Sequence, residues 1–186
     1  MKLLKTPPFF ASLAALLALA ASCSSPTARR NPVGEPFPDV RGEALDETAV
    51  RLPADVAGGD RPAILLIGYD MDAQFDIDRW LLGLLQLNTP ARLFEVPTID
   101  GMVPGLIAGT IDSGMRSGIP PSDWASVVTL YGDDAERVVA LTGDEGGRNA
   151  RVLLLDRDGT VVWFADRGWS ASLVLALDAR ARELAR

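Results

Sequence analysis

The sequence predicts an α/β protein in which helices cover a β-sheet. Short apolar runs typical of strands alternate with segments whose apolar residues recur at helical spacing. The order along the chain is strand, helix, strand, helix, strand, helix, hairpin, helix. This alternation predicts parallel strands joined by helical crossovers, and the closing hairpin makes the predicted sheet mixed.

The strands are predicted from their apolar runs. Residues 63–69 (AILLIGY) are continuously apolar, which is typical of a strand covered on both faces. Further strands are expected at residues 92–96, 125–131, 152–155 and 160–164. The last two flank an Asp158-Gly159 pair, which favours a hairpin turn because glycine accepts a positive φ.

Four helices are expected between and after these strands. The first has Asp72 as a plausible N-cap. Its apolar face is predicted to comprise Phe75, Ile77, Trp80, Leu81, Leu84 and Leu85. A glycine-interrupted helix over 102–115 and a short helix over 134–141, stopped by Gly143, come next. A final helix runs from Ser170 to the C-terminus.

The N-terminus has the layout of a secretory signal. Lys2 and Lys5 precede an apolar run over residues 9–21, which is shorter than the ~20 residues a membrane span needs. Leu19-Ala20-Ala21-Ser22-Cys23 resembles a bacterial lipobox, although Ala20 stands where leucine is most common. The resemblance implies cleavage before Cys23 and lipid attachment to it. The alternative is ordinary signal cleavage near residues 18–20, which leaves Cys23 as a free thiol.

These features divide the chain into three parts. Residues 1–22 are a predicted lipoprotein signal peptide, residues 23–36 a flexible tether, and residues 37–186 one domain. Ser24, rather than aspartate, follows Cys23, which by resemblance implies the outer membrane facing the periplasm if the cell has one. The expected partners are the membrane, through the lipid, and an envelope protein.

Composition excludes several functions. Removing Lys2 and Lys5 from the 18 basic residues leaves 16 arginines against 25 acidic residues, a net charge of −9. With no basic patch interleaved with aromatics, nucleic acid is not an expected partner. The chain has no histidine, which excludes a Ser-His-Asp triad and histidine-ligated metals. No cofactor, resident metal or catalytic residue is predicted.

Two stretches resemble a known superfamily. Val33-Gly-Glu-Pro-Phe-Pro-Asp-Val40, followed by Gly42 and Val50-Arg-Leu-Pro53, resembles the opening segment of peroxiredoxin-like and TlpA-like thioredoxin-fold proteins. The segment from Val152 to Val162 resembles the hairpin of the same superfamily. The resemblance implies a thioredoxin-like three-layer sandwich, with a mixed sheet, flanking helices and a C-terminal hairpin plus helix.

The segment from Leu153 to Gly168 also resembles the ending of the ATP10 group of assembly factors. Trp163 and Gly168 stand in comparable places, and Val162 replaces an arginine. What this resemblance implies is help in assembling a membrane complex.

The chain departs from the superfamily where redox members carry their thiols. Residues 69–76, after the first core strand, contain no cysteine, and Arg148-Asn-Ala-Arg151 stands where redox members have a cis-proline. A thiolate at a helix N-terminus is what thioredoxin chemistry needs. We therefore expect no disulfide exchange and no peroxide reduction by the domain.

The densest acidic cluster is Asp70, Asp72, Asp76 and Asp78. It could serve a hydrolase that also uses Arg116, either through the carboxylates themselves or by holding Ca²⁺ or Mg²⁺, or it could place acids at a helix N-terminus. It is not an EF-hand loop, because Phe75 and Leu81 occupy the glycine and glutamate positions.

Glu95 and Asp100 could form an acid–base pair but are expected in a solvated loop. Trp80 and Trp163 are expected in the core. Trp124 and Trp169, in predicted loops, are expected on a partner surface. The segment 102–118 could instead be an apolar flap over a small molecule, with Trp169 nearby.

The favoured hypothesis is a lipid-anchored envelope protein with a redox-inactive thioredoxin-like domain that acts in binding, scaffolding or assembly. Its lipid attachment site is Cys23. Its candidate binding surface comprises Asp70, Asp72, Asp76, Trp124 and Trp169.

Overall fold

The structure, a computed structural model, describes residues 26–101 and 105–186. Cys23 and the predicted signal peptide lie outside the described residues. The elements are β1 (Val40–Ala44), β2 (Ala49–Leu52), β3 (Ala63–Gly68), η2 (Met71–Ala73), α2 (Gln74–Gln86), β4 (Arg92–Ile99), α3 (Gly105–Gly118), η3 (Pro121–Ser126), β5 (Val128–Tyr131), α4 (Gly132–Thr142), β6 (Arg151–Leu155), β7 (Val161–Ala165) and α5 (Ala171–Leu184).

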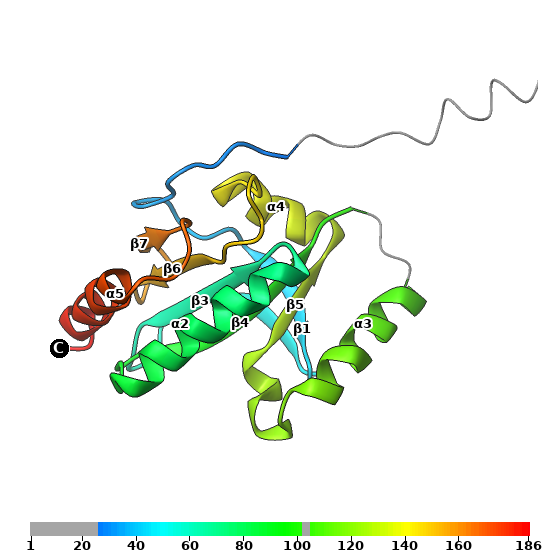
Figure 1. The fold of residues 1–186 in the computed structure, drawn as a ribbon, viewed down its shortest axis with the longest axis horizontal. Coiled ribbons are helices and arrows are strands. Elements are labelled where there is room, and N and C mark those ends of the chain that lie inside the picture. Colours follow the sequence, from blue (N-terminus) through cyan, green and yellow to red (C-terminus); the bar gives the residue numbers. More distant parts are fainter. Residues whose placement is uncertain (1–25, 102–104) are drawn as a thin grey trace, which may run out of the picture.

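The seven strands form one mixed sheet in the order β2-β1-β5-β4-β3-β6-β7 (Figure 1). Strands β3, β4 and β5 are parallel, whereas β1, β6 and β7 run antiparallel to the neighbours from which they extend the sheet. The β6–β7 hairpin turns at Asp156–Gly159, where Gly159 has φ of 79° and Asp156 accepts the Gly159 amide. The predicted α/β architecture and its hairpin are therefore confirmed.

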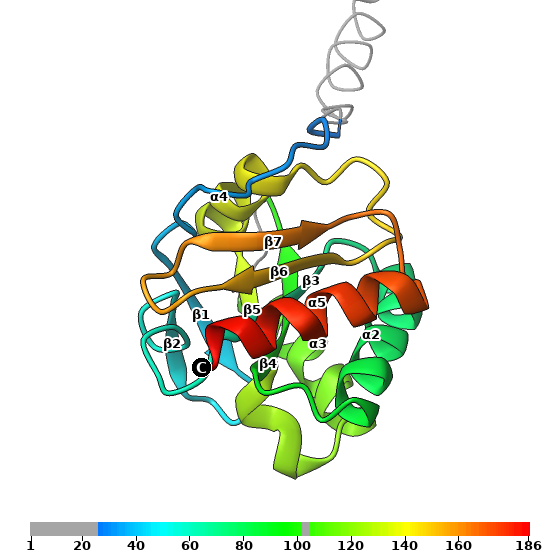
Figure 2. The same ribbon diagram turned by 90° about the vertical axis from the view of Figure 1, so that its left-hand side faces the viewer.

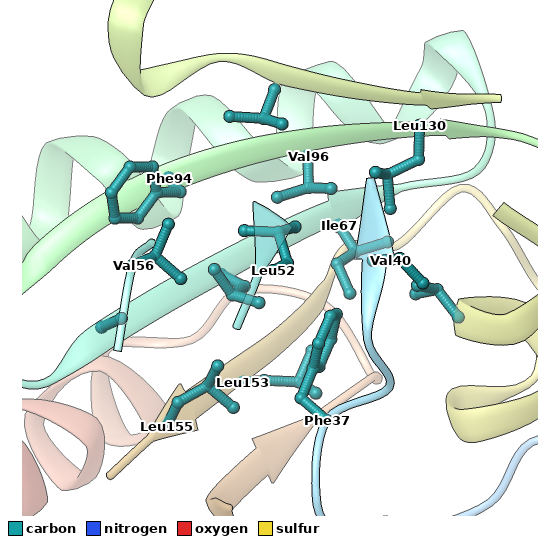
Figure 3. Close-up of a cluster of buried hydrophobic side chains, with 14 of the residues drawn as sticks. Phe37, Val40, Leu52, Val56, Ile67, Phe94, Val96, Leu130, Leu153 and Leu155 are labelled. Atoms are coloured by element: carbon teal, nitrogen blue, oxygen red, sulfur yellow. The ribbon is translucent and has the colours of Figure 1, made fainter. Parts of the chain in front are cut away.

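The two faces of the sheet bury separate apolar clusters because successive strand residues point to opposite sides. Leu65 and Ile67 of β3 face α4, and Figure 3 shows Ile67 beside Val96, Leu130 and Phe37. The next-door residues Ile64 and Leu66 face α2 and α5. The sheet is thus the middle layer of a three-layer sandwich.

Helix α2 follows β3 and covers one face of the sheet. Ile77, Trp80 and Leu84, spaced three and four residues apart, are almost fully buried, and Trp80 meets Trp163 edge-on at 6.0 Å between ring centroids. Phe75 and Leu85 were also predicted on this face but are exposed. The 3.6-residue period places Phe75 on the opposite side of the helix from Ile77, whereas Leu85, one residue after Leu84, lies at the edge of the buried face.

The second half of the domain differs from the sequence prediction mainly at one strand. Residues 121–126 form η3, so only the end of the expected 125–131 strand is extended, as β5. Pro120 and Pro121 favour this turn because proline fixes φ at a helical start. Helix α4 ends at Gly143 with φ of 69°, as expected, and Ser170 caps α5 by accepting the amide of Leu173.

The N-terminal segment lies along the domain from its first described residues. Arg30 donates its amide to the carbonyl of Thr142, and the amide of Glu145 donates to the carbonyl of Thr27. Further on, Gly34 and Val161 are joined by an amide–carbonyl bond. Of the predicted tether over 23–36, the part from Thr27 onward is therefore hydrogen-bonded to the domain rather than free of it.

This N-terminal segment and the α3–η3 region lie at opposite ends of the domain. Figures 1 and 2 both place residues 26–30 beside α4, with α3 and η3 at the far end. Within the described residues, no helix combines the length and the apolar character needed to cross a bilayer.

Candidate functional site

The segment after β3, where the thioredoxin-like resemblance would place a redox site, carries aspartates. We use the name aspartate edge for six residues around the starts of α2 and β6: Tyr69, Asp70, Asp72, Asp76, Arg148 and Arg151. Asp70 accepts the amide of Asp72 at 2.9 Å and so caps η2. Asp72 is exposed, and its carboxylate lies 3.4 Å from the guanidinium of Arg148. Capping and surface pairing therefore account for both carboxylates, which is the helix N-terminal interpretation considered above.

Asp76 is not on the surface. It is 8% exposed, and its two carboxylate oxygens accept the amide of Ala150 at 3.0 Å and the amide of Trp169 at 2.7 Å. One side chain thus joins α2 to the start of β6 and to the loop before α5. Asp76 was predicted on a binding surface, but it is buried, and its hydrogen bonds hold three segments of the domain together.

The aspartate cluster does not converge on one point. Asp78 lies farther along α2 and accepts the side-chain amide of Gln74 at 3.0 Å. Over the described residues, no group of three or more His, Cys, Asp or Glu side chains is placed to hold a metal ion. The geometry of these described residues therefore gives no support to the Ca²⁺- or Mg²⁺-dependent alternative.

The segment 148–151, where the resemblance would place a cis-proline, ends at a buried arginine. Arg151 is fully buried, and its guanidinium donates to the carbonyls of Gly143, Glu145 and Asn149 at 3.1, 2.6 and 2.9 Å. It lies 5.5 Å from the ring centroid of Tyr69. Burial lowers the pKa of Arg151, but with these acceptors the side chain remains a cation that organises the 143–149 loop.

Tyr69 completes this buried polar group. Its hydroxyl lies 2.7 Å from the hydroxyl of Thr142, and burial raises its pKa above the ordinary value. A phenol held neutral in this way bonds to protein groups and is no acid or base near neutral pH. The polar side chains of the aspartate edge are therefore hydrogen-bonded to other groups of the protein.

A groove lies beside this edge, between α2, β4, α3 and η3. Its volume is about 670 Å³, within the range of ordinary ligand pockets. Its apolar lining comes from Leu81, Leu85, Leu93, Met115, Ile119, Pro120 and Val127. Gly114 and Gly118 of α3 leave room over it, because a helix face without side chains keeps the groove open.

Three carboxylates, those of Asp78, Glu95 and Asp123, also line the groove. Among its described lining residues there is no lysine and no arginine. Glu95 is 8% exposed, and burial raises its pKa from the ordinary 4.5. A hydrogen bond from Gln74 lowers that pKa in part, while the charge of Asp78 raises it further.

Glu95 was expected with Asp100 in a solvated loop, and that expectation is wrong. Glu95 lies within β4, whereas Asp100 is exposed beyond the end of the strand. The signal was present in the alternation of Leu93, Phe94, Glu95 and Val96. Phe94 and Val96 face one cluster, so Glu95 must share the opposite face with Leu93.

The solvent side of α2 carries an apolar stripe that continues the groove. We call Met71, Phe75, Leu82 and Leu85 the outer stripe. Met71 lies in η2, just before α2, and the spacing of the other three places them on one face of α2. All four are exposed, with Met71 92% and Phe75 73% exposed. Leu85 belongs both to the stripe and to the groove. The apolar surface therefore extends from the groove over the helix.

The two tryptophans predicted on a partner surface lie apart. Trp124 is half-buried beside the groove, donates its indole N–H to the carbonyl of Ile119 at 2.9 Å and lies under the guanidinium of Arg116. Trp169 packs near Gly83, between α2 and α5, and does not line the groove. The flap alternative stays a prediction, since residues 102–104 of its segment lie outside the described residues.

Comparison with known proteins gives matches by structure. No protein-family model matches the sequence, and no curated protein matches it. Yeast Sco1 with copper bound is similar with a TM-score of 0.55 and 15% identity, over 82% of this chain and 94% of that one. A thiol:disulfide interchange protein from Bacteroides sp. is similar with a TM-score of 0.53 and 16% identity, over 81% and 90%.

A third similar structure is the pneumococcal exposed lipoprotein thioredoxin of Streptococcus pneumoniae. Its TM-score is 0.51 at 12% identity, over 77% of this chain and 99% of that one. Identities this low relate the folds and not the activities. With its central parallel strands, its C-terminal hairpin and its flanking helices, the chain has a thioredoxin-like fold.

Proposed function

We propose that this chain is a lipid-anchored envelope protein whose thioredoxin-like domain binds a protein partner and carries out no thiol chemistry. The observation that supports this most is the groove. It combines an apolar floor, three carboxylates with no lysine or arginine among the described lining residues, and the exposed apolar side chains of the outer stripe. Exposed apolar surface next to a groove is the usual mark of an interaction site.

The absence of thiols in the domain supports the second part of the proposal. The chain has one cysteine, Cys23, in the segment that resembles a lipobox. Acylation would consume that thiol. Yeast Sco1 is similar in fold and holds copper. Copper binding is not proposed for this chain, because copper favours thiolate and imidazole ligands and the chain has no histidine.

The anchor and the groove are compatible in space. The chain is fastened to the α4 end from Thr27 onward, four residues after Cys23. An anchor at Cys23 would hold that end of the domain toward the membrane and turn the α3–η3 end away from it (Figure 2). A groove that faces the envelope space suits an assembly or scaffolding role, and the outer membrane is the proposed location if the cell has one.

Site-specific photocrosslinking in the native cell tests the binding role. A photoreactive residue replaces Leu85, in the groove, or Leu175, an equally apolar and exposed residue on α5. The proposal expects one discrete crosslinked protein from position 85 and none of the same mass from position 175. Equal patterns from both positions, or none from position 85, would contradict it.

Two further measurements address the chemistry and the anchor. The full chain with Cys23→Ser should not accelerate reduction of insulin disulfides by dithiothreitol; sustained turnover would refute the redox-inactive assignment. Intact-mass analysis of the native protein should give a diacylglyceryl-modified N-terminus at Cys23. An unmodified N-terminus elsewhere would sink the lipid anchor without affecting the binding role.

A further inference from the structure

We propose that the groove and the outer stripe together bind an amphipathic helical segment of a partner protein that carries lysine or arginine beside its apolar face. This inference rests on the proposed binding function and specifies its ligand.

The apolar half of the ligand follows from the outer stripe. Phe75 to Leu85 spans ten residue steps of α2, or about 15 Å at 1.5 Å per residue, and Met71 in η2 extends the stripe beyond the start of the helix. A pocket ligand would fill the groove but leave this length uncovered. An amphipathic helix laid along α2 would cover both, with anchors spaced three and four residues apart.

The basic half follows from the charges that line the groove. Asp78 on α2, Glu95 on β4 and Asp123 on η3 come from three different elements and converge on one apolar hollow. Arg116 of α3 is engaged elsewhere, since its guanidinium donates to the carbonyl of Leu45 at 2.6 Å. The described lining therefore offers acceptors and leaves the countercharge to the ligand.

Glu95 is the deepest of these acceptors. It comes from the sheet, under α2, and the described lining residues around it include the neutral amide of Gln74 but no lysine or arginine. Burying a carboxylate without a cation is unfavourable for folding alone. A residue retained at such a position is explained when a partner's ammonium or guanidinium supplies the missing charge.

Charge also selects among the other occupants of an apolar face. Two copies of this chain meeting through their grooves would bring like charges together, so self-association through this face is disfavoured. A bilayer is disfavoured as well, because α3 and η3, which border the groove, lie at the far end of the domain from residues 26–30 (Figure 1).

Calorimetric titration with synthetic helices tests the ligand class. The probe is a 14-residue amphipathic peptide of leucine and lysine, and its control has glutamate in place of every lysine. The receptor is the full chain with Cys23→Ser. We expect saturable binding of the lysine peptide, at least tenfold tighter than that of the glutamate peptide and weaker at high salt.

Matched variants locate the binding. Glu95→Gln and Asp78→Asn should each weaken the lysine peptide at least fivefold, whereas Glu136→Gln, which removes the same charge from the exposed surface of α4, should change its affinity less than twofold. Leu82→Ser on the stripe should weaken binding, and Leu175→Ser on α5 should not. Thermal unfolding of each variant checks that it is folded.

The outcomes separate this inference from the proposed function. Equal losses for Glu95→Gln and Glu136→Gln would mean general attraction of a cation to an acidic protein, and would overturn the inference. Failure of the lysine peptide to bind, while crosslinks from position 85 persist, would overturn the ligand class and leave the binding role standing. Binding only in the presence of anionic vesicles would favour a membrane surface and overturn the inference too.

Discussion

The aspartate edge and the groove lie on either side of the N-terminal part of α2. The polar groups of the two regions have different kinds of partner. At the edge, Asp76 accepts two backbone amides, and Arg151 donates to the backbone of the 143–149 loop. In the groove, Glu95 lies among apolar side chains, and the described lining residues include no lysine or arginine. The charged groups of the first region are paired within the chain, whereas Glu95 has no charged partner among the described lining residues.

Buried charged groups are normally paired within the protein, so a buried carboxylate without a charged partner points to function. The difference between the two regions therefore favours the groove, rather than the aspartate edge, as the binding surface. It also separates two kinds of charged residue, those that stabilise the fold and those that are available to a ligand. Substitutions can change one kind at a time.

Arg151→Met should cause the largest loss of stability. The substitution keeps much of the side-chain volume but removes the guanidinium that donates to the carbonyls of Gly143, Glu145 and Asn149. We expect a loss of roughly 3–5 kcal/mol in the free energy of unfolding, measured by urea denaturation. Arg148→Met, at an exposed position in the same loop, is the control and should stay within about 0.5 kcal/mol. Similar small losses for both would mean that the edge is not a structural unit.

Asp76→Ala should follow, with a loss of about 2–3 kcal/mol, because it removes the acceptor of the Ala150 and Trp169 amides. Asp72→Ala, which breaks only an exposed pair with Arg148, should cost less than about 0.5 kcal/mol. Thermal unfolding compares the two. If Asp76→Ala and Asp72→Ala lost the same stability, the distinction between buried structural carboxylates and surface carboxylates would fail.

Glu95→Gln should have a smaller effect, of opposite sign and dependent on pH. Burial and the charge of Asp78 raise the pKa of Glu95, so the folded chain keeps this proton to higher pH than the unfolded chain does. Stability of the parent therefore falls as pH rises from the ordinary value of 4.5 through the raised pKa. Glutamine does not titrate, so the variant should be more stable than the parent above that window and lose this advantage below it.

Urea denaturation from pH 3.5 to pH 8 measures this difference, with Glu136→Gln as the control for removing a surface carboxylate. A Glu95→Gln variant that is less stable than the parent at neutral pH would indicate that the Glu95 carboxylate is a structural acceptor. The groove would then resemble the edge, and the contrast between the two regions would be lost.

Phe75→Ser should have the smallest effect on stability, within about 0.5 kcal/mol, because the ring is exposed on the outer stripe. Ile77→Ser, two residues along on the buried face, should lose several kcal/mol by contrast. Circular dichroism during heating distinguishes them. A large loss for Phe75→Ser would mean that the stripe packs against the chain itself.

Much of the fold could be predicted because its signals are local. The apolar run at residues 63–69, the Asp158-Gly159 turn and the stop at Gly143 each dictate a backbone conformation without help from distant residues. The pairing of β1 with β5, and the hydrogen bonding of residues 27–30 to the end of α4, depend on contacts between segments far apart in the sequence. No local pattern carries that information.

The site was harder to predict for a physical reason. Counting apolar residues on α2 gave one face, although the helical period places Ile77 and Phe75 on opposite sides of the helix, and burial shows that Ile77 is the one that faces the core. Glu95 was grouped with Asp100 by sequence proximity, whereas strand alternation places it under α2. Asp76 was grouped with its neighbours, although its partners come from β6 and from the loop before α5.

The central claim is that the groove, and not the aspartate edge, is the binding surface. Amide-resolved NMR of the full chain with Cys23→Ser, titrated with the leucine–lysine peptide, observes both regions in one experiment. We predict saturable shifts at Glu95, Met115 and Ile119, with those of Asp70, Arg148 and Ala150 small by comparison. Shifts concentrated at Asp70, Arg148 and Ala150, with the groove unchanged, would contradict this claim.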